Sequence, residues 1–205
     1  MLFSAISFGC CIMYAVRFYK NLFTDEGYIT WTLPASPLTQ LWAKILSASI
    51  WYVLDLTICF AAAWFLISGD NIQSALERIK PDFQAALGMS FSSFCGLVVF
   101  FSFVGILSCV LFIYTSIAIG QLVPAHRIIV SIAVYFILNL ITQIISIGVS
   151  IITSVFPDYV FSPAQTSFSE YFFQMLLIGT CTTTVLAIAG YFITYRILQR
   201  KVNLI

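Results

Sequence analysis

The chain has 205 residues, of which 61% are hydrophobic and only 8% are charged, and its formal net charge is +1. Ordinary globular proteins carry about a quarter charged residues, so this composition excludes a soluble domain and predicts an integral membrane protein. The nine basic residues are scattered along the chain, whereas a nucleic-acid-binding protein needs Lys and Arg clustered on one surface.

Five apolar stretches reach, or nearly reach, the roughly 20 residues that a helix needs to cross a bilayer. None alternates between apolar and polar residues as the strands of a membrane barrel do. We therefore predict a single all-α transmembrane domain over residues 1–205, with about five membrane helices. Their expected ranges are 1–19, 45–68, 87–119, 128–155 and 171–195.

The first stretch is the shortest, because its apolar part ends at Val16. It reaches across the hydrocarbon core only if the helix continues through Arg17 and Tyr19. No positive region precedes it and no small-residue cleavage site follows it, so we interpret it as a true span rather than a signal peptide. We expect sequence upstream of it to be missing or never to have been present.

A long polar and aromatic interruption, RFYKNLFTDEGYITWTLPASPLTQLWAK, follows this span. The first helix can continue to Phe23, and Ser36 and Pro37 are suited to cap and begin the next helix. One interpretation of segment 20–44 is a short cytosolic helix held between two membrane helices. The alternative, of equal weight, is a surface loop anchored by Trp31 and Trp42 at the membrane interface.

Asp55 is an acidic residue inside the second predicted span. A carboxylate at the centre of a membrane helix costs about 2.5–3.5 kcal/mol on insertion scales, so it should face the bundle interior or water. It either lines a translocation path or binds a proton, or it only fixes helix packing through a local hydrogen bond.

Two outer loops complete the predicted topology. The apolar residues of segment 70–81 fall on one helical face, which predicts a helix lying in the interface that ends at Pro81. The loop 156–170 carries two prolines among aromatic residues, and either crosses the surface or dips back towards the membrane.

Basic residues near span ends favour the cytoplasmic side, and seven of the nine lie on one side of this topology. The N-terminus is therefore expected outside and the C-terminus in the cytosol. The seven are Arg17, Lys20, Lys44, Arg127, Arg196, Arg200 and Lys201.

No pattern of catalytic or metal-binding residues is present in the sequence. The single histidine, His126, stands alone at a loop, and the six cysteines all fall within predicted spans without a C-x-x-C pair. We expect these cysteines to serve as small packing residues. There is no nucleophile elbow, no H-E-x-x-H and no phosphate-binding G-x-x-x-x-G-K-[ST], so we expect no catalytic residue, cofactor or metal in this chain.

The polar segment resembles a pattern of ABC-2 type transporter permeases from low-GC Gram-positive bacteria, Phe-Tyr-x-x-Leu-(Phe/Tyr)-x-(Asp/Ser)-Glu-Gly-Tyr followed by Leu-Pro. The later stretch SIAIGQLVPAHRIIVSIAVYF is similar to the second cytosolic turn of these permeases, in which Gly-Gln-Leu precedes a basic residue. Together these motifs cover about a quarter of the chain. They do not indicate which substrate is transported.

The resemblance implies the membrane subunit of a type V exporter-like ABC transporter in a bacterial plasma membrane. Such a subunit pairs with a second permease copy or a homologous permease, and a separate ATPase subunit binds and hydrolyses ATP. The residues that would contact the ATPase are Asp25, Glu26, Gly27, Tyr28, Trp31, Leu33, Gly120, Gln121, His126 and Arg127.

The chain departs from this family at its N-terminus, because its five spans correspond to helices two to six of a six-helix fold. It is then either a fragment in which Met1 is an internal start, or a shortened relative. Two other functional classes remain open, a membrane scaffold or immunity protein that needs no ATPase, and an ion- or proton-coupled carrier that uses Asp55.

Overall fold

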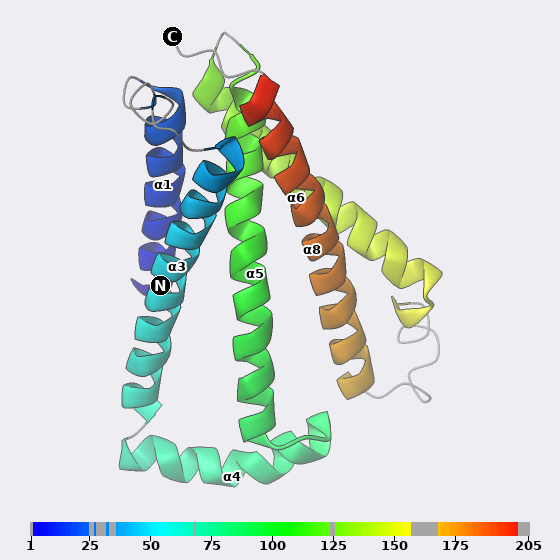
Figure 1. Ribbon diagram of the computed structural model, residues 1–205. Helices are drawn as coiled ribbons and strands as arrows, with labels where there is room; N and C mark the ends of the chain where they lie inside the picture. Colours follow the sequence, from blue (N-terminus) through cyan, green and yellow to red (C-terminus); the bar gives the residue numbers. More distant parts are fainter. Residues whose placement is uncertain are drawn as a thin grey trace. The chain divides into compact units, whose positions relative to one another are not determined.

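The computed structural model describes residues 2–24, 27, 32, 36–67, 69–123, 126–156 and 168–200. Within these residues the chain is helical, as predicted, and six long helices follow one another along the sequence (Figure 1). They are α1 (Leu2–Phe23), α3 (Pro37–Ile67), α4 (Asp70–Leu87), α5 (Phe91–Gly120), α6 (Arg127–Ile152) and α8 (Phe168–Arg200).

Four of these helices, α3, α5, α6 and α8, are long and apolar enough to cross a membrane. Their large apolar side chains are mostly exposed on the chain, and only 6% of the most apolar part of α6 is buried. Such surfaces are stable where lipid tails cover them. These helices confirm four of the predicted spans and identify a multi-pass membrane protein.

The fifth predicted span corresponds to α1, which is not among those four helices. It has 22 residues and continues without a break through Arg17 and Lys20. At 1.5 Å per residue its length is about 33 Å, enough to cross the hydrocarbon core. That α1 spans the membrane therefore stays a prediction.

Serine side chains cap two of the membrane helices. The backbone N–H of Thr39 donates to Ser36 Oγ over 3.2 Å at the start of α3, as predicted, and that of Ser93 donates to Ser90 Oγ over 3.2 Å at the start of α5. Because α3 begins at Pro37, well before the predicted span, segment 20–44 is helical at both of its ends.

The predicted end of the outer helix at Pro81 is wrong, because α4 continues through this proline to Leu87. A proline in a helix removes one backbone hydrogen bond, and here the turns on both sides maintain the helix. The helix ends at Gly88, which has a left-handed φ of 68° and whose N–H donates to the carbonyl of Gln84 over 2.9 Å. Only glycine adopts this conformation without strain.

The chain divides into two compact units. The first contains residues 1–55, 106–141 and 185–205, and the second contains residues 56–105 and 142–184. In the second unit, Phe83 of α4 packs edge-on against Phe91 and Phe94 of α5, with ring centroids 5.6 and 5.1 Å apart. These contacts hold α4 to the beginning of α5. The predicted outer loop 156–170 lies mainly outside the described residues.

Candidate functional site

The buried core of the first unit surrounds the last turns of α5. Phe18 of α1 stacks on Tyr114 of α5 with ring centroids 3.8 Å apart and an interplanar angle of 10°. Both side chains are almost fully buried, with exposed fractions of 1% and 3%. The same core contains Leu22, Phe23, Leu41, Ile45, Val110, Ile113 and Ile117.

A hydrogen bond also joins α5 to α3 at this level. The hydroxyl of Tyr114 donates to the backbone carbonyl of Lys44 over 3.1 Å. Because Phe23 and Lys44 lie close to the two ends of the predicted coupling segment 20–44, both ends are attached to one part of α5. The sequence does not indicate this attachment, because the residues involved are far apart along the chain.

The second predicted cytosolic turn begins at the same end of α5. Gly120 is the last residue of α5 and is buried against the first turn of α6. A Cβ atom at this position would lie 2.0 Å from Ser131 Oγ, 2.9 Å from Ser131 N and 3.0 Å from the carbonyl oxygen of Arg127. The glycine of the Gly-Gln-Leu motif is therefore required by the close approach of two helices, whatever else it does.

The other predicted residues of this turn differ in accessibility. The backbone N–H of Gln121 donates to the carbonyl of Ile117 over 3.1 Å. Its side-chain Nε2 is buried and has no hydrogen-bond partner among the residues that the structure describes. His126 is exposed and has a left-handed φ of 57°. Arg127 begins α6 and is half-buried.

Of the residues predicted in the first coupling segment, only Gly27 is described. It is helical and buried, and its N–H donates to the carbonyl of Thr24 over 2.7 Å. Thr24 in turn donates from its hydroxyl to the carbonyl of Lys20 over 2.7 Å, which completes the last turn of α1. The predicted contacts at Asp25, Glu26, Tyr28, Trp31 and Leu33 lie outside the described residues.

Asp55 is half-buried and lies near a group of polar side chains from four helices. Its carboxyl group lies close to Cys11 and Tyr14 of α1. The Cys11 thiol makes a hydrogen bond with the hydroxyl of Tyr52, one turn before Asp55 on α3. Asp55 is therefore not an isolated acid facing lipid.

The remaining members of this polar group come from α5 and α6. The Cys109 thiol lies close to the side chains of Cys11, Tyr52 and Tyr135, and Asn139 Nδ2 donates to the backbone carbonyl of Tyr135 over 2.8 Å. The cysteine pattern predicts only small packing residues, and it does not indicate that Cys11 and Cys109 lie in a polar group. The spacing of Tyr52 and Asp55, three residues apart on one helical face, was a usable signal for part of it.

Small residues bring α8 against α5. A Cβ atom on Gly190 would lie 2.6 Å from Thr115 Oγ1, and the buried hydroxyl of Thr194 donates to the same Thr115 oxygen over 3.2 Å. Close approach through glycine and threonine is typical of helix pairs in membranes. The turns of α5 that hold α1 and α3 therefore hold α8 as well.

Comparison of the chain with protein-family models, with curated proteins and with solved structures finds no match. Within the described residues, no three His, Cys, Asp or Glu side chains are grouped so that they could hold a metal ion. The candidate site is thus the set of helix contacts around the end of α5, together with the polar group beside Asp55.

Proposed function

We propose that this chain is the membrane-spanning permease subunit of an ABC transporter, driven by ATP that a separate subunit hydrolyses. The observation that supports this proposal is the attachment of both ends of segment 20–44, and of the turn after Gly120, to the last turns of α5. Closely packed helices move together and transmit strain. A displacement of the cytosolic segment is then passed to α1, α3 and α5 at once.

In this mechanism the ATPase pair closes on ATP and pushes segment 20–44. Asp25 and Glu26 pair with basic residues of the ATPase, and Tyr28, Trp31 and Leu33 fill a groove on its surface. The tilt of the attached helices changes access between this chain and a second permease copy or homologue. The cargo that this interpretation allows is a peptide, a lipid or a drug, moved outwards.

Co-purification tests the proposed contact with the ATPase. A tagged full chain is purified from its own host membranes, and any partner carrying a nucleotide-binding motif is identified by mass spectrometry. We expect Asp25→Lys with Glu26→Lys to reduce recovery of the ATPase by about tenfold or more, because breaking a buried interface charge pair typically costs about 2–5 kcal/mol. We expect a similar loss for Trp31→Ala, because removal of an aromatic side chain buried at the centre of an interface often costs about 2 kcal/mol or more.

The matched control for the charge reversal is Glu77→Lys with Asp82→Lys, which changes charge equally on exposed positions of α4. This control should leave recovery of the ATPase unchanged. Unaltered co-purification in the Asp25 and Glu26 variant would remove the assignment. Recovery of the folded chain without any ATPase would favour a membrane scaffold.

A proton-coupled carrier is the second candidate, because the polar groups around Cys11 and Tyr52 surround the position of Asp55. Its test uses the purified chain in liposomes that contain a pH-sensitive dye and are given a potassium gradient with valinomycin. Proton entry without ATP that Asp55→Leu abolishes would support the carrier. Proton entry equal to that of empty liposomes would exclude it.

A further inference from the structure

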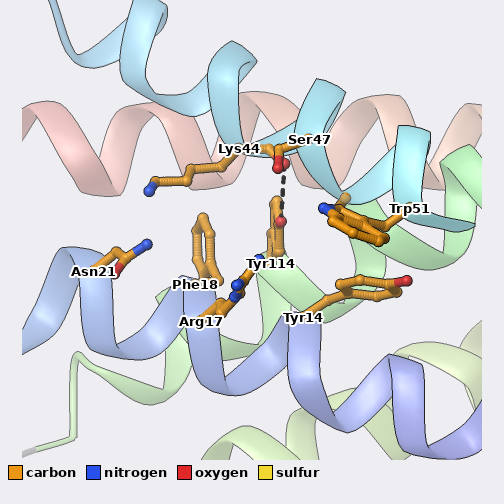
Figure 2. A pocket seen from close by; sticks show the side chains of 9 residues that line it. Tyr14, Arg17, Phe18, Asn21, Lys44, Ser47, Trp51 and Tyr114 are labelled. Atoms are coloured by element: carbon orange, nitrogen blue, oxygen red, sulfur yellow. Dashed lines mark hydrogen bonds between the residues drawn. The ribbon is translucent and has the colours of Figure 1, made fainter.

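A cavity of about 270 Å³ opens between α1, α3 and α5 in the first unit. Figure 2 shows the side chains of Arg17 and Asn21 on α1 and of Lys44 and Ser47 on α3 around it. Tyr14 and Trp51 line the same cavity further along the two helices. The cavity therefore combines polar groups at one end with aromatic surface at the other.

The electrostatic character of this cavity is positive. Arg17 and Lys44 come from different helices and lie close enough to repel each other. None of the described residues that line the cavity is acidic. Arg and Lys side chains that line a cavity from two neighbouring helices can contact the oxygens of a phosphate or carboxylate, so the cavity is suited to a negatively charged group.

The walls of the cavity are held rigidly. Phe18 and Tyr114, which stack on each other, are both buried and both line the cavity. The dashed line in Figure 2 marks the hydrogen bond from Tyr114 to the backbone at Lys44, which fixes the α3 wall relative to α5. A ligand would meet a preformed site, which lowers the entropic cost of binding.

The surroundings of the cavity distinguish a lipid from a soluble anion. Arg17 and Lys44 belong to the basic side of the chain, which favours the cytoplasmic membrane surface. Towards the predicted membrane centre, α1 and α3 expose large apolar side chains, among them Ile12, Met13, Leu54 and Ile58. A headgroup in the cavity could thus keep its acyl chains against the outer surface of the same two helices.

The size of the cavity agrees with a headgroup and not with a whole lipid. Sites for complete drug-sized ligands occupy about 300–1,000 Å³. Arg and Lys are the side chains that most often bind phosphate oxygens in proteins, and Asn and Ser can add neutral donors. We propose that this cavity binds the phosphate of an anionic phospholipid headgroup. The inference does not depend on the proposed transport function.

Native mass spectrometry of the full chain in detergent tests this site. Phosphatidylglycerol and phosphatidylcholine with identical acyl chains are added in equal amounts, and bound lipids are counted. We expect selective retention of phosphatidylglycerol. Replacing a charge-assisted hydrogen bond to the phosphate with a neutral one costs about fivefold in affinity, so Arg17→Gln with Lys44→Gln should lower that preference about 30-fold.

The matched control is Lys20→Gln with Arg196→Gln, which removes two exposed basic residues that do not line the cavity. It should retain the preference of the unmodified chain. If the Arg17 and Lys44 variant does not fold, Ser47→Glu serves instead, because it places a carboxylate beside both cations from an exposed position. This variant should also lose selective binding of phosphatidylglycerol.

Two results would overturn the inference. The first is equal retention of both lipids by the unmodified chain, or an unchanged preference in the Arg17 and Lys44 variant. The second concerns the source of the phosphate group. Displacement of phosphatidylglycerol by millimolar inorganic phosphate would identify the site as one for a soluble phosphate instead of a lipid.

Discussion

Replacing Gly120 with alanine places a methyl group where the end of α5 meets the first turn of α6. The new Cβ would lie 2.0 Å from Ser131 Oγ, 2.9 Å from Ser131 N and 3.0 Å from the Arg127 carbonyl oxygen. The serine hydroxyl can rotate away, but it then loses its 2.9 Å hydrogen bond to the Arg127 carbonyl. The two backbone atoms can only move with the helix.

These contacts set the expected size of the effect. The lost hydrogen bond costs about 1 kcal/mol, and moving a packed helix turn costs about 1–3 kcal/mol. The higher helix propensity of alanine offsets at most about 1 kcal/mol. We therefore expect the free energy of unfolding to fall by about 1–3 kcal/mol. For a chain of this length, each kcal/mol lowers the melting temperature by about 2–4 °C, so the melting temperature should fall by about 2–12 °C.

Thermal unfolding of the detergent-purified chain, followed by size-exclusion fluorescence, measures this change. Gly105→Ala is the matched control, because it lies in the same helix and its Cβ would have no atom within 4 Å. Adding Ser131→Ala should recover part of the loss, since it removes the hydroxyl that has lost its hydrogen bond to the Arg127 carbonyl. Equal melting temperatures for Gly120→Ala and Gly105→Ala would refute the packing argument.

Three further substitutions test the helix contacts by the same melting assay. Tyr114→Phe removes the hydroxyl that donates to the Lys44 carbonyl and should cost about 1 kcal/mol; no change would mean that this bond adds nothing. Ser36→Ala removes the cap of α3 and should also cost about 1 kcal/mol, whereas Ser36→Asp should retain stability. Gly190→Ala meets Thr115 Oγ1 at 2.6 Å and should destabilise by about 1–3 kcal/mol, a loss that Thr115→Ala should partly reverse.

The helical class and four of the membrane spans could be predicted because they depend on local composition. A stretch such as 127–152 is apolar all along its length, so its burial in lipid requires no knowledge of its neighbours. The cap at Ser36 is equally local, because the hydroxyl and the N–H that it accepts from are three residues apart. Helix ends were less accurate, and the expected stop at Pro81 failed because one lost hydrogen bond did not outweigh the turns that follow.

The residues of the candidate site also divide into those that could be predicted from the sequence and those that could not. Asp55 was identified from its sequence alone, since an acid in an apolar helix is unusual wherever it points. Its polar neighbours on α1, α5 and α6 were missed because Cys11, Cys109 and Tyr135 resemble ordinary packing residues until the helices place them together.

Composition is enough to establish the class of the protein: an all-helical, multi-pass membrane chain with a polar segment between its first two predicted spans. Composition does not predict how the helices pack. Their packing places the two ends of that segment, the turn at Gly120 and the pair Arg17 and Lys44 around one end of α5. Composition and periodicity act within about one helix length, so they can define each helix separately. Which faces meet is decided by contacts between residues that lie 70 or more positions apart along the chain, such as the hydrogen bond from Tyr114 to the Lys44 carbonyl and the stacking of Phe18 on Tyr114.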